Sequence, residues 1–381
     1  MLMLPPQRLS PPPELRALTG IRGIAATMVV FLHYGPGWFS LLPGLRFLEP
    51  VTGSGGLGID LFFILSGFIL SYVYFDAHSR FGLTDYRRFL WHRIARLYPV
   101  HLATLGLLVV FLLAAKLRNI PLTGDYPWTG LPFQLTMTHC WPFCPGGQWN
   151  YPSWSISAEW FAYLFIFPIA LFFLKSRIRP GLYLLVACGL FALLFGVHAR
   201  FQQITTPSLA LLSVSCKFIA GSAMFLLYKN KTSIAAFCRR HASWIALCFL
   251  PLVGLNNIPH RGLIMVCLMP FLILGFTSEE SLAARLLATR FFVWTGRISY
   301  SVYMIHGVLI KIFKVAMPEE HYVQGSLASR VAVVSFQFLA IFLAAAACYY
   351  VVEVPARNWL RRMGKQKSPH KIAPKSKLQS A

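Results

Sequence analysis

Long apolar runs alternate with short polar connections along most of the chain. Each run has about 17 to 26 residues, and at about 1.5 Å per residue a helix of that length crosses most or all of the roughly 30 Å hydrocarbon core of a membrane. The pattern therefore predicts an all-α integral membrane protein, a bundle of about ten transmembrane helices. The predicted spans are residues 20–40, 55–75, 93–115, 153–174, 180–198, 208–228, 242–258, 262–278, 291–316 and 327–352.

Basic side chains gather in alternate connections between these spans. Residues 41–54 and 317–326 are poor in lysine and arginine, whereas the connections next to them along the chain are basic, with Arg87 and Arg88 in one and Arg285 and Arg290 in another. Because basic connections stay in the cytoplasm, both termini are predicted to be cytoplasmic and the loop 116–152 is predicted to face outward. The expected parts are a cytoplasmic N-terminal segment (residues 1–17), a transmembrane domain (18–360) and a basic, disordered cytoplasmic tail (361–381).

The composition agrees with this organisation and reduces the number of possible functions. Of the 381 residues, 56% are hydrophobic and 12% are charged, which is about half the charged fraction of a soluble domain. A net charge of +23 would suit a nucleic-acid partner, but the positive residues lie in short loops, as membrane topology requires. We therefore expect no nucleic-acid partner and some attraction of the tail to membrane lipid. The segments outside the spans are too short for a soluble catalytic domain, so the function must reside in the bundle or at its rims.

The N-terminus and one pair of cysteines carry further expectations. The first residues lack an apolar core followed by a cleavage site, so the first span is expected to act as an uncleaved signal anchor. Cys140 and Cys144 lie together in the loop sequence HCWPFC. They could form a disulfide if that loop faces an oxidising compartment, and the sequence leaves this open. Too few other ligands lie nearby for a metal site, and no metal is expected.

Ionisable side chains inside apolar spans are costly and are therefore candidates for function. Arg22 stands at the cytoplasmic start of the first span, and His33 lies about 16 Å further along the helix axis, near the middle of the membrane. Histidine exchanges protons near neutral pH and can attack an acyl carbon, which suits acyl transfer. The alternatives are a histidine hydrogen-bonded within the bundle and an arginine that only anchors the topology.

Two carboxylates and a second histidine follow. Asp60, in GIDLFFILSGF, lies in the outer half of the second span and could orient a histidine, bind a sugar hydroxyl or pair with an arginine. Glu159, in WSISAEW, lies roughly two turns below the outer surface. The aromatic residues around Glu159 form either an interfacial belt or a stacking surface for sugar rings. His306 falls near mid-membrane in a polar span, and Glu353, near the end of the last span, is expected to be structural.

An arginine pair enters the third span from the cytoplasm. Arg93 and Arg96 are three residues apart and so share one face of a helix. Two guanidinium groups at a cytoplasmic mouth suit the binding of phosphate by paired hydrogen bonds, although they could also serve as topology anchors. The sequence contains no GxSxG, P-loop or HExxH motif that would indicate soluble-type chemistry.

Taken in order, five of these features resemble the membrane acyltransferase-3 family, which includes bacterial polysaccharide and Nod-factor O-acetyltransferases. The resemblance covers about residues 15 to 360. It rests on Arg22 and His33 with ten residues between them, GIDLFF and SGF around Asp60, Arg93 and Arg96 before LYP, WSISAEW at Glu159, and ISYSVYMIH ending at His306.

The resemblance implies a ten-helix, multi-pass enzyme of the bacterial inner membrane. Such an enzyme draws an acyl group, usually acetyl, from cytoplasmic acyl-CoA and transfers it to a hydroxyl of a carbohydrate or glycolipid. His33 would then be the catalytic histidine. Arg93 and Arg96 would bind the CoA phosphates, with Arg22 supporting the donor side. Asp60, Glu159 and His306 would shape the pocket or assist proton transfer.

Two other classes of function also fit a polar membrane bundle. A transporter or flippase of a glycan or small solute would place polar residues inside its spans too, but it would not depend on acyl-CoA. The sequence shows no inverted repeat of the kind that many transporters have. A purely structural membrane protein would leave the mid-membrane ionisable residues without a purpose. The residues alone indicate neither the acceptor nor the length of the acyl group.

Overall fold

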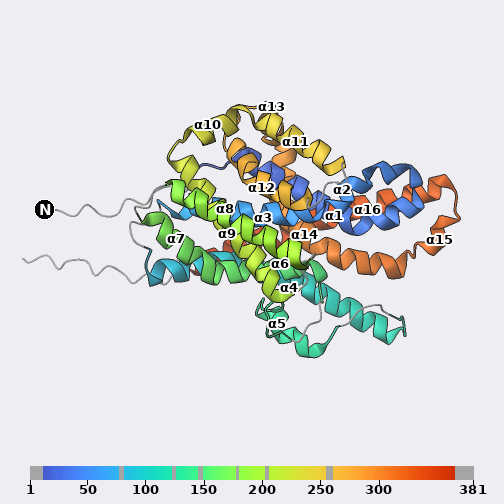
Figure 1. The fold of residues 1–381 in the computed structure, drawn as a ribbon. Coiled ribbons are helices and arrows are strands. Elements are labelled where there is room, and N and C mark those ends of the chain that lie inside the picture. Colours follow the sequence, from blue (N-terminus) through green and yellow to red (C-terminus); the bar gives the residue numbers. More distant parts are fainter. Residues whose placement is uncertain are drawn as a thin grey trace, which may run out of the picture.

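The structure is a computed structural model that describes residues 12–76, 81–121, 126–144, 149–176, 180–201, 206–254 and 261–364. Throughout these segments the chain forms helices and turns and no strand, which confirms the prediction of an all-α protein. The helices gather into one bundle (Figure 1). Residues 1–11 and 365–381, which include most of the two predicted terminal segments, lie outside the described residues.

Seven helical segments of the described chain are long and apolar enough to cross a membrane. They are α1 (Arg16–Leu41), Pro43–Tyr74 ending in α3 (Gly56–Tyr74), α4 (Leu83–Leu117), Tyr151–Lys175 with α6 (Trp154–Phe161) and α7 (Phe167–Lys175), α9 (Pro207–Lys229), α14 (Arg290–Ala316), and Leu327–Met363 with α16 (Leu327–Cys348) and α17 (Val354–Met363). Three shorter apolar helices lie in α8 (Pro180–Phe201), α11 (Ala242–Gly254) and α12 (Arg261–Gly275). Each of the ten predicted spans therefore contains a helix among the described residues, while the number that crosses the membrane stays a prediction.

Two helices extend well beyond their predicted ends. α4 begins at Leu83, ten residues before the predicted start, so Arg87 and Arg88 lie within a helix rather than in a loop. A charged segment ends an apolar run, but it does not end a helix, because straight-chain charged residues are good helix formers. The last helical segment likewise continues through a π-helical turn at Tyr349–Glu353 into α17, past the predicted end at residue 352.

Close helix crossings hold the centre of the bundle together. α1 packs most extensively against α14, and α3 against α9. A Cβ atom built on Gly296 of α14 would lie 1.8 Å from the carbonyl oxygen of Thr19, and one built on Gly67 would lie 1.9 Å from that of Phe218. Only glycine therefore allows these backbones to approach so closely. The α1–α14 crossing joins the two helices that carry His33 and His306.

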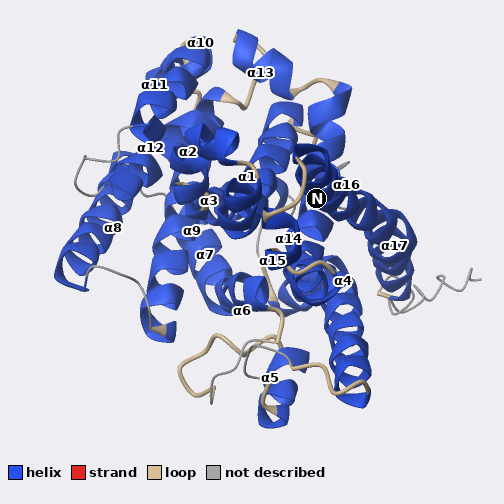
Figure 2. Cartoon of the chain, turned by 90° about the vertical axis from the view of Figure 1, so that its right-hand side faces the viewer, coloured by secondary structure: helices blue, strands red, loops and turns tan. Residues whose placement is uncertain are grey.

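The connection from α4 to α6 forms a separate small structure at one end of the bundle. Its helix α5 (Leu131–Leu135) stands outside the main group of helices, near the end of α4 (Figure 2). His101 of α4 hydrogen-bonds the carbonyl oxygen of Gln134 across 2.8 Å, and Tyr98 donates to that of Leu135. Cys140 and Cys144, which lie in this connection, are both free thiols in the structure.

Candidate active site

The two histidines predicted at mid-membrane depth lie against each other. His33 of α1 and His306 of α14 are 273 residues apart in the sequence, yet Nδ1 of His33 is 3.3 Å from Nε2 of His306. The two rings are stacked, with centroids 5.2 Å apart. His306 is fully buried and His33 is half-buried. The structure therefore brings two separately predicted candidates into one pair.

The hydrogen bonds of this pair determine which nitrogen of each ring carries its proton. Nδ1 of His33 lies 2.9 Å from the carbonyl oxygen of Val29, and Nδ1 of His306 lies 3.2 Å from that of Val302. A carbonyl oxygen only accepts, so each neutral ring is protonated at Nδ1. Nε2 of His306 then carries a lone pair that faces the same single Nδ1 proton of His33, which is closer to Val29, and Nε2 of His33 keeps a lone pair with no hydrogen-bond partner among the described residues. That nitrogen is suited to remove a proton or to attack an acyl carbon.

The backbone around His306 is tied to the rest of the site. Tyr34 of α1 donates a 2.8 Å hydrogen bond to the carbonyl oxygen of His306. Asn150 donates through Nδ2 to the carbonyl oxygen of Met304 at 3.0 Å. Tyr303 donates to the carbonyl oxygen of Pro152 at 3.0 Å and accepts from Ser155 at 2.7 Å. The connection before α6 and the histidine-bearing helix α14 are therefore held in a fixed register.

Tyr151 lies at this pair, and the sequence analysis did not single it out. Its ring stands edge-on to His33, with centroids 4.7 Å apart, and its centroid lies 6.0 Å from that of His306. Its hydroxyl oxygen is buried and makes no hydrogen bond to any described residue. A buried hydroxyl without a partner is unusual in folded proteins. In the sequence, its place in the tryptophan-rich segment before Glu159 was the available signal.

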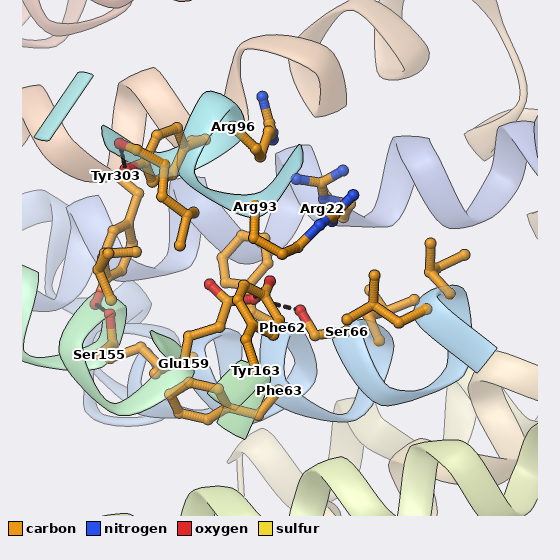
Figure 3. A pocket seen from close by; sticks show the side chains of 17 residues that line it. Arg22, Phe62, Phe63, Ser66, Arg93, Arg96, Ser155, Glu159, Tyr163 and Tyr303 are labelled. Carbon is orange, nitrogen blue, oxygen red and sulfur yellow. Dashed lines mark hydrogen bonds between the residues drawn. The ribbon is translucent and has the colours of Figure 1, made fainter. Parts of the chain in front are cut away.

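An inner cavity of about 140 Å³ collects most of the predicted charged residues. Neither histidine lines it, but Tyr303 does, and the ring centroid of Tyr303 lies 5.7 Å from that of His306. Arg22, Arg93 and Arg96 lie together at one end of the group of lining side chains, at the top of Figure 3, and Tyr303 and Ser155 lie to their left. Glu159 also lines this cavity, between hydrogen bonds of 2.5 Å from Ser66 and from Tyr163. Residues from α1, α3, α4, α6 and α14 thus meet around one space.

The three arginines differ in their partners. Arg96 is paired with the fully buried Glu353, which also accepts from Arg357 at 3.1 Å and from Ser301 at 2.9 Å. Glu353 therefore has the structural role expected for it. No carboxylate among the described residues lies within ion-pair distance of Arg22 or Arg93. The guanidinium of Arg93 instead lies 5.8 Å from the ring centroid of Phe89, and its Nε is buried without a partner.

This arrangement leaves the inner cavity with an excess of positive charge. Arg22 and Arg93 have no carboxylate within ion-pair distance among the described residues, and the single carboxylate that lines the cavity, Glu159, does not balance the three arginines, one of which pairs with Glu353. Burial strengthens the field of these charges. Such a site favours an anion with several oxygen atoms, because guanidinium groups form paired hydrogen bonds to phosphate or carboxylate.

A second, outer cavity of about 750 Å³ contains Asp60. The two carboxylates that the sequence placed together on the outward side thus line different cavities. Asp60 pairs with Lys217 of α9 at 2.5 Å, and the same ammonium group donates to Ser213 at 2.6 Å. Trp141, Trp154 and Tyr151 add aromatic walls. The sequence analysis missed Lys217, although a lysine inside the predicted span 208–228 was itself a signal.

The outward connection contributes a neutral histidine to the wall of the outer cavity. Nε2 of His139 lies 3.0 Å from Oγ of Ser153, which itself donates to the carbonyl oxygen of Asn150. Burial, and then the neighbouring His101, lower the pKa of His139 to about 4. Burial also raises the pKa of the Cys140 thiol to about 11, so that thiol is un-ionised near neutral pH. Among the described residues, no cluster of three or more histidine, cysteine or acidic side chains could hold a metal ion.

The chain is similar to known proteins of one family. A family model described as an acyltransferase domain, acyltransferase family 3, matches residues 15–353. The acyltransferase MdmB of Streptomyces mycarofaciens is 33% identical over 161 residues, which is 41% of this chain and 39% of that protein. The protein named "Putative O-acetyltransferase SACOL0978" of Staphylococcus aureus is 23% identical over 372 residues, which is 90% of this chain and 57% of that protein.

A third relative is protein 2 in the picA locus of Rhizobium radiobacter, 33% identical over 116 residues, or 30% of this chain and 55% of that protein. The chain thus matches between 39% and 57% of the length of these three relatives. No solved structure matches the chain significantly.

Proposed function

We propose, from the premise that this chain belongs to the acyltransferase-3 family, that it transfers an acyl group from cytoplasmic acyl-CoA to a hydroxyl of an envelope or exported carbohydrate. Family membership and the long apolar helices give a membrane-embedded O-acyltransferase. The acyl-CoA donor, with acetyl as the usual group, the carbohydrate acceptor and the bacterial inner membrane are the proposal. The observation that carries it is the histidine pair, in which His306 packs against Tyr303 of the cationic inner cavity and His33 packs against Tyr151 of the aromatic outer one.

The inner cavity supports a phosphorylated thioester as the donor. Arg22 and Arg93 lack carboxylate partners among the described residues and can take up the negative charge of CoA phosphates. Arg96 was predicted to share this task, but its pairing with Glu353 favours an indirect role, in which it shapes the cationic end and adds positive field. The positive-inside rule places this end toward the cytoplasm, where acyl-CoA is made.

The outer cavity supports a carbohydrate as the acceptor. Trp141 and Trp154 offer flat apolar surfaces on which the C–H face of a sugar ring can lie. Lys217 uses two of its three N–H donors on Asp60 and Ser213, so one donor remains, and the free lone pairs of Asp60 can accept from a sugar hydroxyl. Donor and acceptor groups side by side suit neighbouring hydroxyls of a sugar.

His33 then carries out the transfer. Its Nε2 removes the proton of the acceptor hydroxyl as the hydroxyl oxygen bonds to the thioester carbonyl carbon, and the carbonyl electron pair moves onto its oxygen. Collapse of this tetrahedral intermediate breaks the C–S bond, and the CoA thiolate takes the proton back from His33. The carbonyl oxygen of Val29 accepts from Nδ1 of His33 and so keeps the ring in the tautomer that this step needs, and the lone pair of His306 Nε2 lies beside the same proton. A transient acyl-histidine would use the same nitrogen, and labelling of the protein by acyl-CoA alone would distinguish the two routes.

The test is the O-acetyl content of the cell's surface glycans, measured by proton NMR. Strains are the parent, the gene deletion, and the deletion complemented with wild type or with His33→Ala, each checked for protein in the membrane. We expect the acetyl signal to disappear on deletion and to return with wild type only. An unchanged spectrum, together with no turnover of radiolabelled acetyl-CoA by the purified protein, would favour the transporter or flippase instead.

A further inference from the structure

The inner and outer cavities are separated by side chains of α3. Ile59 and Phe63 are the residues that line both cavities. They are four residues apart, so they lie on the same face of the helix, one turn from each other. Phe63 is 3% exposed, and its ring centroid lies 6.3 Å from that of Trp154, which lines only the outer cavity. We call Ile59 and Phe63 the dividing wall.

The dividing wall lies where the acyl group of the donor would point. The arginines form one end of the inner cavity, Tyr303 and Ser155 lie at its side, and Phe63 lies below the arginines (Figure 3). The ring centroid of Tyr303 is 5.7 Å from that of His306, so this side adjoins the histidine pair. A donor with its phosphates at Arg22 and Arg93 therefore presents its thioester near the histidines and its acyl chain beyond them, toward the wall. This step rests on the proposed function.

We propose that Ile59 and Phe63 determine the length of the acyl group that the enzyme accepts. The inner cavity measures about 140 Å³, whereas the outer cavity measures about 750 Å³. A short acyl group ends at the dividing wall, while a longer chain has to enter the space that the acceptor needs. The wall thus keeps the acceptor hydroxyl next to the carbonyl carbon and excludes long chains.

The other side chains near the histidine pair are held in place more firmly than the dividing wall. The hydroxyl of Tyr303 is bonded both to the carbonyl oxygen of Pro152 and to Ser155, and all three residues are buried. Phe62 packs against the ring of Tyr303, with centroids 6.1 Å apart. By contrast, the wall consists of two apolar side chains that have empty space on both sides. Shortening either of them joins the two cavities without breaking a hydrogen bond.

The experiment measures binding of acetyl-, butyryl- and hexanoyl-CoA to the full chain in lipid nanodiscs by calorimetry, so it requires no acceptor. The variants are Phe63→Ala, Phe63→Leu and Ile59→Ala. Phe68→Leu is the matched control, because Phe68 is a fully buried phenylalanine of the same helix that lines neither cavity. Folding of each variant is checked by its thermal transition.

We expect wild type and Phe68→Leu to prefer acetyl-CoA. In Phe63→Ala the affinity for hexanoyl-CoA relative to acetyl-CoA should rise by about tenfold or more, the usual effect of a few methylene groups in an apolar pocket. Phe63→Leu and Ile59→Ala should give smaller rises in this ratio. They test the proposal if Phe63→Ala does not fold. An unchanged chain-length preference in folded wall variants would overturn this inference alone. Failure of wild type to bind any acyl-CoA would overturn the proposed donor itself.

Discussion

At the scale of single residues, the most informative groups are polar ones that lack the partner their burial demands. The hydroxyl of Tyr151 costs about 1 to 3 kcal/mol when it is buried without a hydrogen bond, and a site that binds substrate is where such a cost is found. Its ring stands edge-on to that of His33, and we predict that its hydroxyl donates to the carbonyl oxygen that becomes negative during acyl transfer.

Replacing Tyr151 with phenylalanine is therefore predicted to separate activity from stability. Without the hydroxyl, kcat for acyl transfer should fall about 100-fold, because one donor to the developing oxyanion is lost. The melting temperature should stay the same or rise, because no hydrogen bond to the protein is broken. Tyr303→Phe is the control, since its hydroxyl bonds Pro152 and Ser155 and its loss should lower the melting temperature. An unaltered kcat in Tyr151→Phe would remove Tyr151 from the reaction.

The pair of Asp60 and Lys217 makes a different prediction, because both charges are partnered. Their side chains are 21% and 10% exposed. Lys217→Met leaves a carboxylate with little solvent and no counter-charge, which should destabilise the fold by about 3 to 5 kcal/mol. The double variant Asp60→Leu with Lys217→Met removes both charges and should recover most of that stability.

The double variant should nevertheless lose acceptor binding, because the donor and acceptor groups of the outer cavity are gone. Thermal unfolding in detergent checks the predicted change in stability. Glycan O-acetylation, measured on the same variants, checks the predicted loss of acceptor binding. If Lys217→Met is as stable as wild type, the ion pair does not hold α3 to α9. If the double variant keeps full O-acetylation, the pair does not bind the acceptor.

The residue scale also shows what one sequence could and could not predict. His33, His306, Asp60 and Glu159 stood out because each is an ionisable group in an apolar run. Their partners did not, because the sequence does not contain the packing that brings distant helices together. Arg96 and Glu353 are 257 positions apart, and their pairing follows from how α4 meets the end of the last helical segment. Lys217 is the exception, since the same rule that found Asp60 could have found it.

At the scale of helices, two crossings position the chemistry. The spans were predictable from hydrophobic length alone, but the angles and registers between them depend on where small residues permit contact. Thr295 of α14 and Gly23 of α1 meet so closely that a Cβ on Gly23 would lie 2.2 Å from the hydroxyl oxygen of Thr295. Gly296 faces the carbonyl oxygen of Thr19 in the same way. The histidine pair lies further along the same two helices.

Gly296→Ala is therefore predicted to disable the enzyme from a distance. The added methyl group forces α1 and α14 apart, at a cost of about 1 to 3 kcal/mol, and lengthens the contact between His33 and His306. Gly106→Ala is the matched control, because a Cβ on Gly106, within α4, meets nothing within 4 Å, so alanine there should gain up to about 1 kcal/mol of helix stability. Melting temperature and kcat of both variants are the measurements. Equal behaviour of the two would mean that the crossing does not position the histidines.

At the scale of the whole molecule, the open question is how the helices cross the membrane. α11 has 13 residues and α12 has 15, so they reach only about 20 and 22 Å, less than the roughly 30 Å of hydrocarbon. Either both cross a locally thinned bilayer or both turn back within it. With α8 as a crossing helix, the number of crossings is even in both cases. We therefore predict that both ends of the helical bundle lie on one side, and the basic connections predict that this side is the cytoplasm.

Fusions of green fluorescent protein and alkaline phosphatase test this topology. After Met363, the fluorescent protein should fold and the phosphatase should be inactive, whereas the phosphatase placed after Leu117 should be active. The reverse pattern would invert the bundle and place the arginine end of the inner cavity on the side without acyl-CoA, which would contradict the proposed donor. A chain truncated after Gly254 and fused there to the phosphatase distinguishes a crossing α11 from one that turns back within the membrane. An active phosphatase there means that α11 crosses and that the bundle has ten spans, while an inactive one means that α11 and α12 form a re-entrant pair beside the outer cavity.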